Sequence, residues 1–118
     1  DVRGHGIPGA LISMSIHSML YDLMMKVTDP VQVMERLNTH MFRIYDENDD
    51  KKLISYYFTG IYLIIDTKAK KIEYVNAGHP PGLVIDKNGA TSLLTTGCPP
   101  IGLLSELEIN KGELFYEC

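Results

Sequence analysis

The residues with the clearest chemical potential are at the start of the chain, in the run Asp1-Val2-Arg3-Gly4-His5-Gly6. A carboxylate beside flexible glycines can reach a hard cation, and the backbone carbonyl of Val2 offers a second oxygen. Oxygen ligands favour Mg²⁺ or Mn²⁺, and two such ions about 3.5–4 Å apart activate a water for attack on phosphorus. One aspartate cannot hold two ions, and an isolated Asp before a turn is more often a cap or a solvated carboxylate. The run alone therefore leaves both interpretations open.

The glycines of Gly4–Gly9 also match the G-x-G-x-x-G pattern of dinucleotide-binding folds. Those folds continue with a second strand and an acidic residue about 20 residues later. This chain continues instead with a second predicted helix, so its context argues against a dinucleotide site. An anion site at the N-terminus of the following helix fits the turn, and so does a plain strand-to-helix connection.

The histidines differ in what their neighbours allow. His5 could donate a proton to a leaving serine oxygen, since the ordinary pKa of imidazole is near neutrality, although a His between two glycines also serves simply to shape the turn. His79 precedes two prolines, where local hydrogen bonding is the expected role. His17 and His40 fall on predicted helices and are expected to have no chemical role.

Two helices are predicted to follow the glycine turn. Apolar residues recur at helical spacing over residues 8–27 and again over residues 30–45, where Asp29 is the predicted N-cap of the second helix. In the first helix Leu11 and Met14 widen the apolar stripe. This helix is therefore either covered on most sides or built to meet a second surface.

The second part of the chain has the composition of strands. β-Branched and aromatic residues dominate there, and Asn88-Gly89 is a strong hairpin signal. Strands are predicted over residues 53–65, 71–76, 82–85 and 91–94 and after the turn at 110–112, with an irregular segment over 97–102. Two helices followed by an antiparallel meander make an α+β domain.

Composition limits the function classes. The 118 residues are 45% hydrophobic and 22% charged, which fits one globular domain with a real core. A formal net charge of −4 gives no basic field, so nucleic acid and anionic membrane are not expected as partners. The 2 cysteines, the lack of a signal peptide and the short apolar runs together predict a cytoplasmic protein without a membrane span in this segment.

Several blocks, in order along nearly the whole chain, resemble the signature elements of the PPM-type metal-dependent serine/threonine phosphatases of the RsbU/SpoIIE branch. They are Asp1-Val2-Arg3-Gly4-His5-Gly6-Ile7-Pro8-Gly9-Ala10-Leu11, Val33-Met34-Glu35-Arg36-Leu37-Asn38, Tyr57-Phe58-Thr59-Gly60-Ile61-Tyr62, Tyr74-Val75-Asn76-Ala77-Gly78-His79-Pro80-Pro81 and Pro100-Ile101-Gly102-Leu103. Arg3 and Gly9 depart from the usual pattern, but neither is at a ligand position.

The resemblance implies a fold, a reaction and partners. The fold would be part of an α-β-β-α sandwich. Asp1 would be the metal-bridging carboxylate and Val2 a backbone ligand, with two Mn²⁺ or Mg²⁺ ions in the intact domain and direct hydrolysis of phosphoserine or phosphothreonine. The implied substrate is a phosphorylated anti-sigma-factor antagonist in a bacterial stress-response or sporulation pathway. An upstream sensor or regulatory domain is the implied neighbour.

The resemblance also predicts that residues 1–118 are the central segment of a single phosphatase domain whose first and last strands are missing. The other metal ligands of the family do not occur here, so little activity is expected from the segment alone. A competing hypothesis from another class is a non-catalytic regulatory or dimerisation module, in which the methionine-rich helices bind a partner or form a homodimer.

Overall fold

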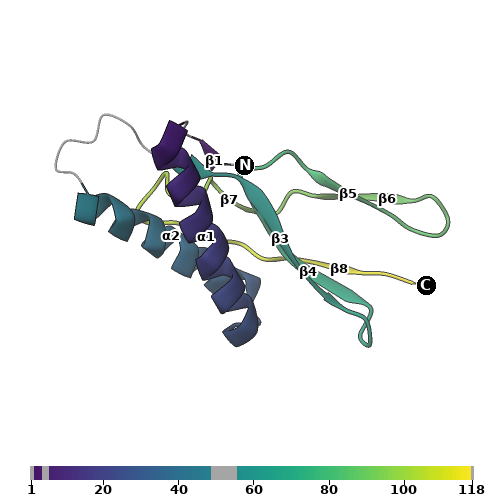
Figure 1. Cartoon of the computed structure of the whole chain (residues 1–118). Helices are drawn as coiled ribbons and strands as arrows, with labels where there is room; N and C mark the ends of the chain where they lie inside the picture. The colour runs from purple at the N-terminus through teal and green to yellow at the C-terminus, as the bar shows by residue number, and fades with distance from the viewer. Residues whose placement is uncertain (1, 4–5, 49–55, 118) are drawn as a thin grey trace.

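The computed structural model describes residues 2–3, 6–48 and 56–117 (Figure 1). The helices α1 (Gly6–Lys26) and α2 (Pro30–Asn48) agree with the predicted pair. Asp29 is the N-cap of α2, as predicted: its Oδ1 accepts a hydrogen bond from the Val31 N–H at 3.1 Å. The Val33 N–H donates to the Asp29 carbonyl at 3.1 Å, which begins the helical hydrogen-bond ladder.

The strands confirm the α+β class. They are β1 (Val2–Arg3), β2 (Tyr57–Phe58), β3 (Gly60–Asp66), β4 (Lys71–Ala77), β5 (Gly82–Ile85), β6 (Thr91–Leu94), β7 (Gly97–Cys98) and β8 (Gly112–Phe115). The strand predicted over 53–65 is divided at Thr59 into β2 and β3, and its residues 53–55 are outside the described residues. The strands predicted over 82–85 and 91–94 have the predicted bounds.

Strand β4 is the centre of the main sheet. Strand β3 pairs with it antiparallel along its full length, from Gly60↔Ala77 to Asp66↔Lys71. On its other side β8 pairs antiparallel and β7 pairs parallel. The hairpins β3–β4 and β5–β6 are sequential antiparallel neighbours, as expected, whereas β7 and β8 both return to β4. Strand β7 also adds a short regular pairing within a segment that we predicted to be irregular.

The turns of both hairpins are closed by an aspartate. Asp86 Oδ1 accepts hydrogen bonds from the Asn88 N–H at 2.8 Å and the Ala90 N–H at 2.9 Å, and Gly89 has a φ of +84°. This geometry explains the hairpin signal, because glycine adopts positive φ without steric cost. In the turn between β3 and β4, Asp66 Oδ1 accepts from two backbone N–H groups in the same way.

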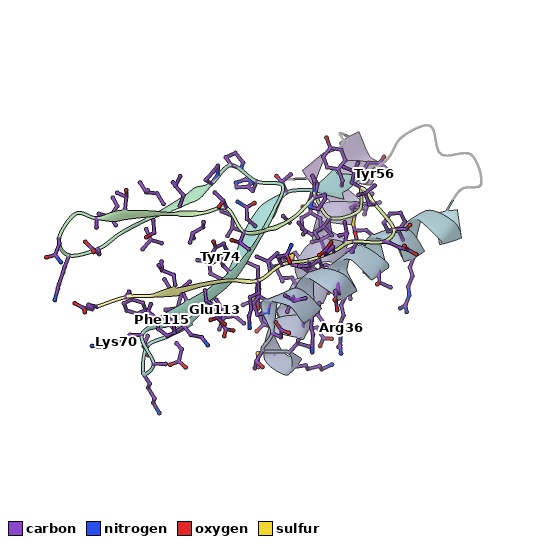
Figure 2. All side chains as sticks on the ribbon, turned by 180° about the vertical axis from the view of Figure 1, so that it is seen from behind. Arg36, Tyr56, Lys70, Tyr74, Glu113 and Phe115 are labelled. Atoms are coloured by element: carbon purple, nitrogen blue, oxygen red, sulfur yellow. The ribbon has the colours of Figure 1, made fainter. Side chains whose placement is uncertain are left out.

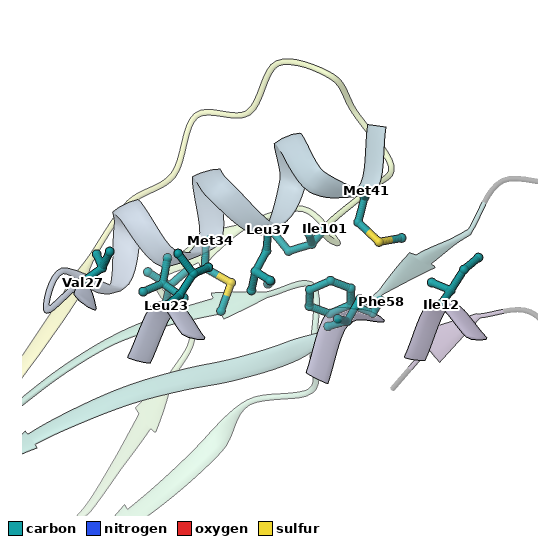
Figure 3. Packing of buried hydrophobic residues seen from close by; sticks show 12 residues of the cluster. Ile12, Leu23, Val27, Met34, Leu37, Met41, Phe58 and Ile101 are labelled. Carbon is teal, nitrogen blue, oxygen red and sulfur yellow. The ribbon is translucent and has the colours of Figure 1, made fainter. Parts of the chain in front are cut away.

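The main core lies between the helices and one face of the sheet (Figure 3). Its buried members are Ile12, Ile16, Leu23 and Val27 from α1, Val33, Met34, Leu37 and Met41 from α2, and Phe58, Val75, Ala77 and Ile101 from the strands and loops. Side chains alternate between the faces of a strand, so Ile72, Tyr74 and Asn76 of β4 point to the opposite face.

The opposite face of β4 contacts the β5–β6 hairpin and the segment after it. Tyr74 points from β4 toward this segment, and its hydroxyl accepts a hydrogen bond from the Thr96 N–H at 3.4 Å (Figure 2). An open groove of about 700 Å³ separates the hairpin from the sheet, with Ile72 and Leu114 on one wall and Val84 on the other. Helices, sheet and hairpin therefore form successive layers.

Helix α1 presents a second apolar surface, so within the described part of the chain it is not covered on most sides. The side chains of Leu11, Met14, Tyr21, Met24 and Met25 are 57–77% exposed, while the opposite side of the helix is in the core. We call these five residues the α1 outer patch. No described helix is both long enough and apolar enough to cross a bilayer.

The core position of Leu37 yields a stability prediction. Leu37→Ala should lower the free energy of unfolding by about 2–5 kcal/mol, because it removes buried methyl groups and leaves a cavity between α2 and the sheet. Glu35→Ala is the matched control, since Glu35 is exposed on the same helix, and it should change stability by less than about 0.5 kcal/mol. Urea unfolding of the full-length protein measures both; equal losses would contradict the described core.

Candidate functional site

Sequence blocks that are far apart in the chain meet at one end of the molecule. Strand β1 pairs antiparallel with β2, with Val2 opposite Phe58 and Arg3 opposite Tyr57. Phe58 also exchanges both backbone hydrogen bonds with Ile101, at 3.0 and 2.9 Å. The opening run, the Tyr57–Tyr62 block and the Pro100–Leu103 block are thus joined by main-chain hydrogen bonds.

The turn after β4 joins the same end. Ala77 pairs with Gly60 at the start of β3, and the Gly78 N–H donates to the Cys98 carbonyl at 2.9 Å. Thr59, which directly follows β2, places its hydroxyl oxygen 3.0 Å from Nδ1 of His79. Thr59 follows Phe58, which pairs with Val2, so the Thr59–His79 hydrogen bond links the His79 turn to the segment that pairs with β1.

The predicted site residues are only partly covered by the structure. Val2 is in β1, where it pairs with β2. Asp1 and His5 are outside the described residues, so the metal-bridging role of Asp1 and the proton-donor role of His5 stay predictions. The donor types fit a hard cation, because a carboxylate and a backbone carbonyl are both oxygen ligands. Within the described part of the chain, β1 pairs with β2.

Two buried asparagines, which the sequence did not single out, hold the loops at this end. Asn38 of α2 is 5% exposed. Its side-chain amide donates to the Leu104 carbonyl at 3.0 Å, and its Oδ1 accepts from the Gly102 N–H at 2.8 Å. Both hydrogen-bonding ends of the amide are used, so Asn38 fixes the loop around Ile101 to the helical layer.

Asn76 performs the same task from the sheet. It is also 5% exposed, its side-chain amide donates to the Leu94 carbonyl at 2.9 Å, and its Oδ1 accepts from the His79 N–H at 2.8 Å. Gly78 between them has a φ of +61°, and a Cβ there would come within 2.5 Å of the Pro100 ring. The turn therefore requires glycine at position 78 both for its backbone conformation and for the close approach of the proline.

The chemistry of the other nearby groups is limited. Desolvation by burial raises the pKa of Cys98 to about 11. Only about one thiol in ten thousand would be ionised at pH 7, so Cys98 is not an activated nucleophile. Among the described residues, no group of three His, Cys, Asp or Glu side chains is arranged to hold a metal ion.

The remaining histidines have structural or solvent-exposed positions. His40 Nε2 is 2.8 Å from the Ser15 hydroxyl oxygen, which links α2 to α1, and His17 is exposed. The local hydrogen bonding expected for His79 is confirmed by its contacts with Thr59 and Asn76. Asn76 could have been noticed in the sequence, since it stands between Val75 and Ala77 in an apolar stretch, whereas Asn38 has polar neighbours and gives no such signal.

Comparisons with known proteins cover nearly the whole chain. The family model of stage II sporulation protein E (SpoIIE) matches residues 1–117. The phosphoserine phosphatase RsbP of Bacillus subtilis (strain 168) is 40% identical over 116 residues, which are 98% of this chain and 28% of that protein. The chain thus spans little more than a quarter of the length of this curated relative. No solved structure matches the chain at a significant level.

The double hydrogen bonding of Asn76 yields the second prediction. Asn76→Ala should lower the free energy of unfolding by about 1–3 kcal/mol, because the Leu94 carbonyl and the His79 N–H would lose their partner in a buried site. Asn110→Ala, at an exposed position, is the matched control and should stay within about 0.5 kcal/mol of wild type. Denaturant unfolding of both variants checks this; an unchanged Asn76→Ala midpoint would contradict it.

Proposed function

We propose that this chain, which belongs to the stage II sporulation protein E (SpoIIE) family, forms part of the catalytic domain of a metal-dependent protein phosphatase. The proposed reaction is hydrolysis of phosphoserine or phosphothreonine on a regulatory protein. The observation that carries the proposal is the convergence of β1, the Thr59 junction, the His79 turn and the Ile101 loop at one end of the molecule. The similarity to a phosphoserine phosphatase supports the same reaction type.

The proposed roles follow from the chemistry of the residues. The Asp1 carboxylate and the Val2 carbonyl would hold Mn²⁺ or Mg²⁺, because both ions prefer oxygen ligands. Ions bound there supply an activated water and neutralise charge on the transferred phosphoryl group. His5 would donate a proton to the leaving serine oxygen.

The proposal extends to the rest of the domain and to its partners. Two residues supply too few ligands for two ions, so the 118-residue chain alone should have little activity. Leu83, Ile85 and Leu93 on the β5–β6 hairpin are 56–63% exposed, which supports a further helical layer over that face, as in an α-β-β-α sandwich. The proposed substrate is a phosphorylated anti-sigma-factor antagonist in a cytoplasmic stress-response or sporulation pathway, and the proposed regulator is an upstream sensor domain.

The proposed metal role of Asp1 yields the third prediction. In the full-length protein Asp1→Asn should lower the Mn²⁺-dependent kcat/KM on a phosphoserine protein by at least about 100-fold, because a neutral amide binds the cation more weakly. Asp22→Asn is the matched control: Asp22 pairs with Lys26 on the exposed surface of α1, and this change should leave kcat/KM within about twofold. Steady-state phosphate release measures both.

Two results would contradict the proposed phosphatase activity. One is a wild-type protein without metal-dependent phosphatase activity. The other is an Asp1→Asn variant as active as wild type. A normal enzymatic rate from the isolated 118-residue chain would instead contradict only the claim that further ligands are needed.

The second candidate function is self-association through the α1 outer patch. Large apolar side chains gathered along one helix are typical of interaction surfaces, and methionine adapts to varied partners. We propose that a second copy of the chain covers this patch, with the two α1 helices packed against each other. This function is compatible with catalysis, because the patch and the core lie on opposite sides of α1.

The patch yields the fourth prediction. The full-length protein should be a dimer by light scattering, and Met14→Glu with Met25→Glu should shift it toward monomer by placing charges in an apolar interface. Gln32→Glu, an exposed position on α2, is the control and should leave the dimer intact. A wild-type monomer at tens of micromolar, or a dimer unaffected by the double substitution, would contradict self-association through this patch.

A further inference from the structure

The His79 turn is more strongly constrained than a connecting turn requires. The backbone N–H of His79 is held by buried Asn76, and its ring is held through Nδ1 by the Thr59 hydroxyl. Gly78 before it is packed against Pro100, and two prolines follow it. His79 is exposed, and both its backbone and its imidazole ring are held by hydrogen bonds.

The second ring nitrogen of His79 is available to a ligand. Within the described part of the chain, the hydrogen bonds of the ring involve Nδ1 alone, so Nε2 has no protein partner there. A hydroxyl can donate or accept, so Thr59 accommodates either tautomer of the ring. A phosphoryl group offers only acceptors, and its presence would select the tautomer with the proton on Nε2, while the Thr59 hydroxyl donates to Nδ1.

The His79 ring lies at the same end of the molecule as the proposed reaction centre. Thr59 directly follows Phe58, the β-sheet partner of Val2, so a short path of one peptide bond and one hydrogen bond leads from the β1–β2 pair to the His79 ring. Asp1 is bonded to Val2 in the sequence. Val2 is one of the proposed ion ligands, so the His79 ring and the proposed ion site lie at the same end of the molecule.

We infer that His79 contacts the substrate, donating a hydrogen bond from Nε2 to a non-bridging oxygen of the phosphoryl group, with Thr59 as its positioning residue. This inference rests on the proposed phosphatase function. It assigns to His79 a binding role beyond the local hydrogen bonds that its sequence context predicts. Free phosphate, the reaction product, offers the same oxygens and should occupy the same contact.

The fifth prediction tests this contact in the full-length protein. His79→Ala should lower kcat/KM on the phosphoserine protein by about 10- to 100-fold, and raise the inhibition constant of inorganic phosphate by about tenfold or more, because a hydrogen bond to a charged group is lost. His79→Gln, whose amide nitrogen can replace Nε2, should recover most of both. The melting temperature should change little in both variants, since the Asn76 contact uses the backbone of residue 79 and the Thr59 contact that is lost is exposed. His17→Ala is the matched control on an exposed histidine and should behave as wild type.

A binding experiment separates this inference from the proposed function. Inorganic phosphate is titrated into the protein with Mg²⁺, and the His79 ring signals are followed by NMR; they should shift with saturation, and Thr59→Val should weaken the response. An active wild type whose His79→Ala variant keeps its kcat/KM and phosphate inhibition overturns the contact while the phosphatase function stands. Loss of activity together with a lowered melting temperature, without recovery in His79→Gln, assigns His79 a structural role and also overturns it. An inactive wild type with unshifted ring signals overturns both.

Discussion

One buried amide, whose hydrogen bonds must be satisfied, organises the end of this molecule where the candidate site lies. Asn76 lies in β4, almost out of contact with solvent, and an unpaired amide there would cost about 1–3 kcal/mol. Its hydrogen bonds reach the Leu94 carbonyl on one side and the His79 N–H on the other. The central strand, the end of the β5–β6 hairpin and the His79 turn are therefore held in one arrangement, and β7 pairs with β4 at the same position, with Gly97 opposite Asn76.

Asn38 extends this constraint to the helices. Its amide holds the loop at Gly102 and Leu104, and this loop includes Ile101, which exchanges backbone hydrogen bonds with Phe58. Phe58 in turn pairs with Val2. A continuous path of hydrogen bonds thus runs from α2 to β1, so a shift of α2 along its axis would strain the strand that precedes the glycine turn. This path joins the helical layer to Val2 and Arg3 of the opening run.

The sequence predicted most of the fold because its signals were local. Helical periodicity, the Asp29 cap and the Asn88-Gly89 turn each depend on a few neighbouring residues, and each is confirmed. The return of β7 and β8 to β4 could not be predicted in this way, since strand pairing over long separations is set by packing and by buried polar groups. The same limit applies to the site: motif order predicted which blocks matter, but the Thr59–His79 contact joins residues that only the fold brings together.

The contrast between the two helices connects the two candidate functions. Helix α2 is amphipathic, with Glu35 and Arg36 exposed opposite its buried stripe, as expected for a helix at a protein surface. Helix α1 is apolar on both sides, and full burial of a Leu or Met side chain contributes about 1.5–3 kcal/mol. Covering the α1 outer patch would thus release several kcal/mol, which is comparable to the energy that separates two states of a switch. Because α1 begins at Gly6, the last residue of the opening run, a molecule bound to the patch would contact the helix that adjoins the proposed metal ligands. The two proposed functions therefore involve the same helix and are compatible with each other.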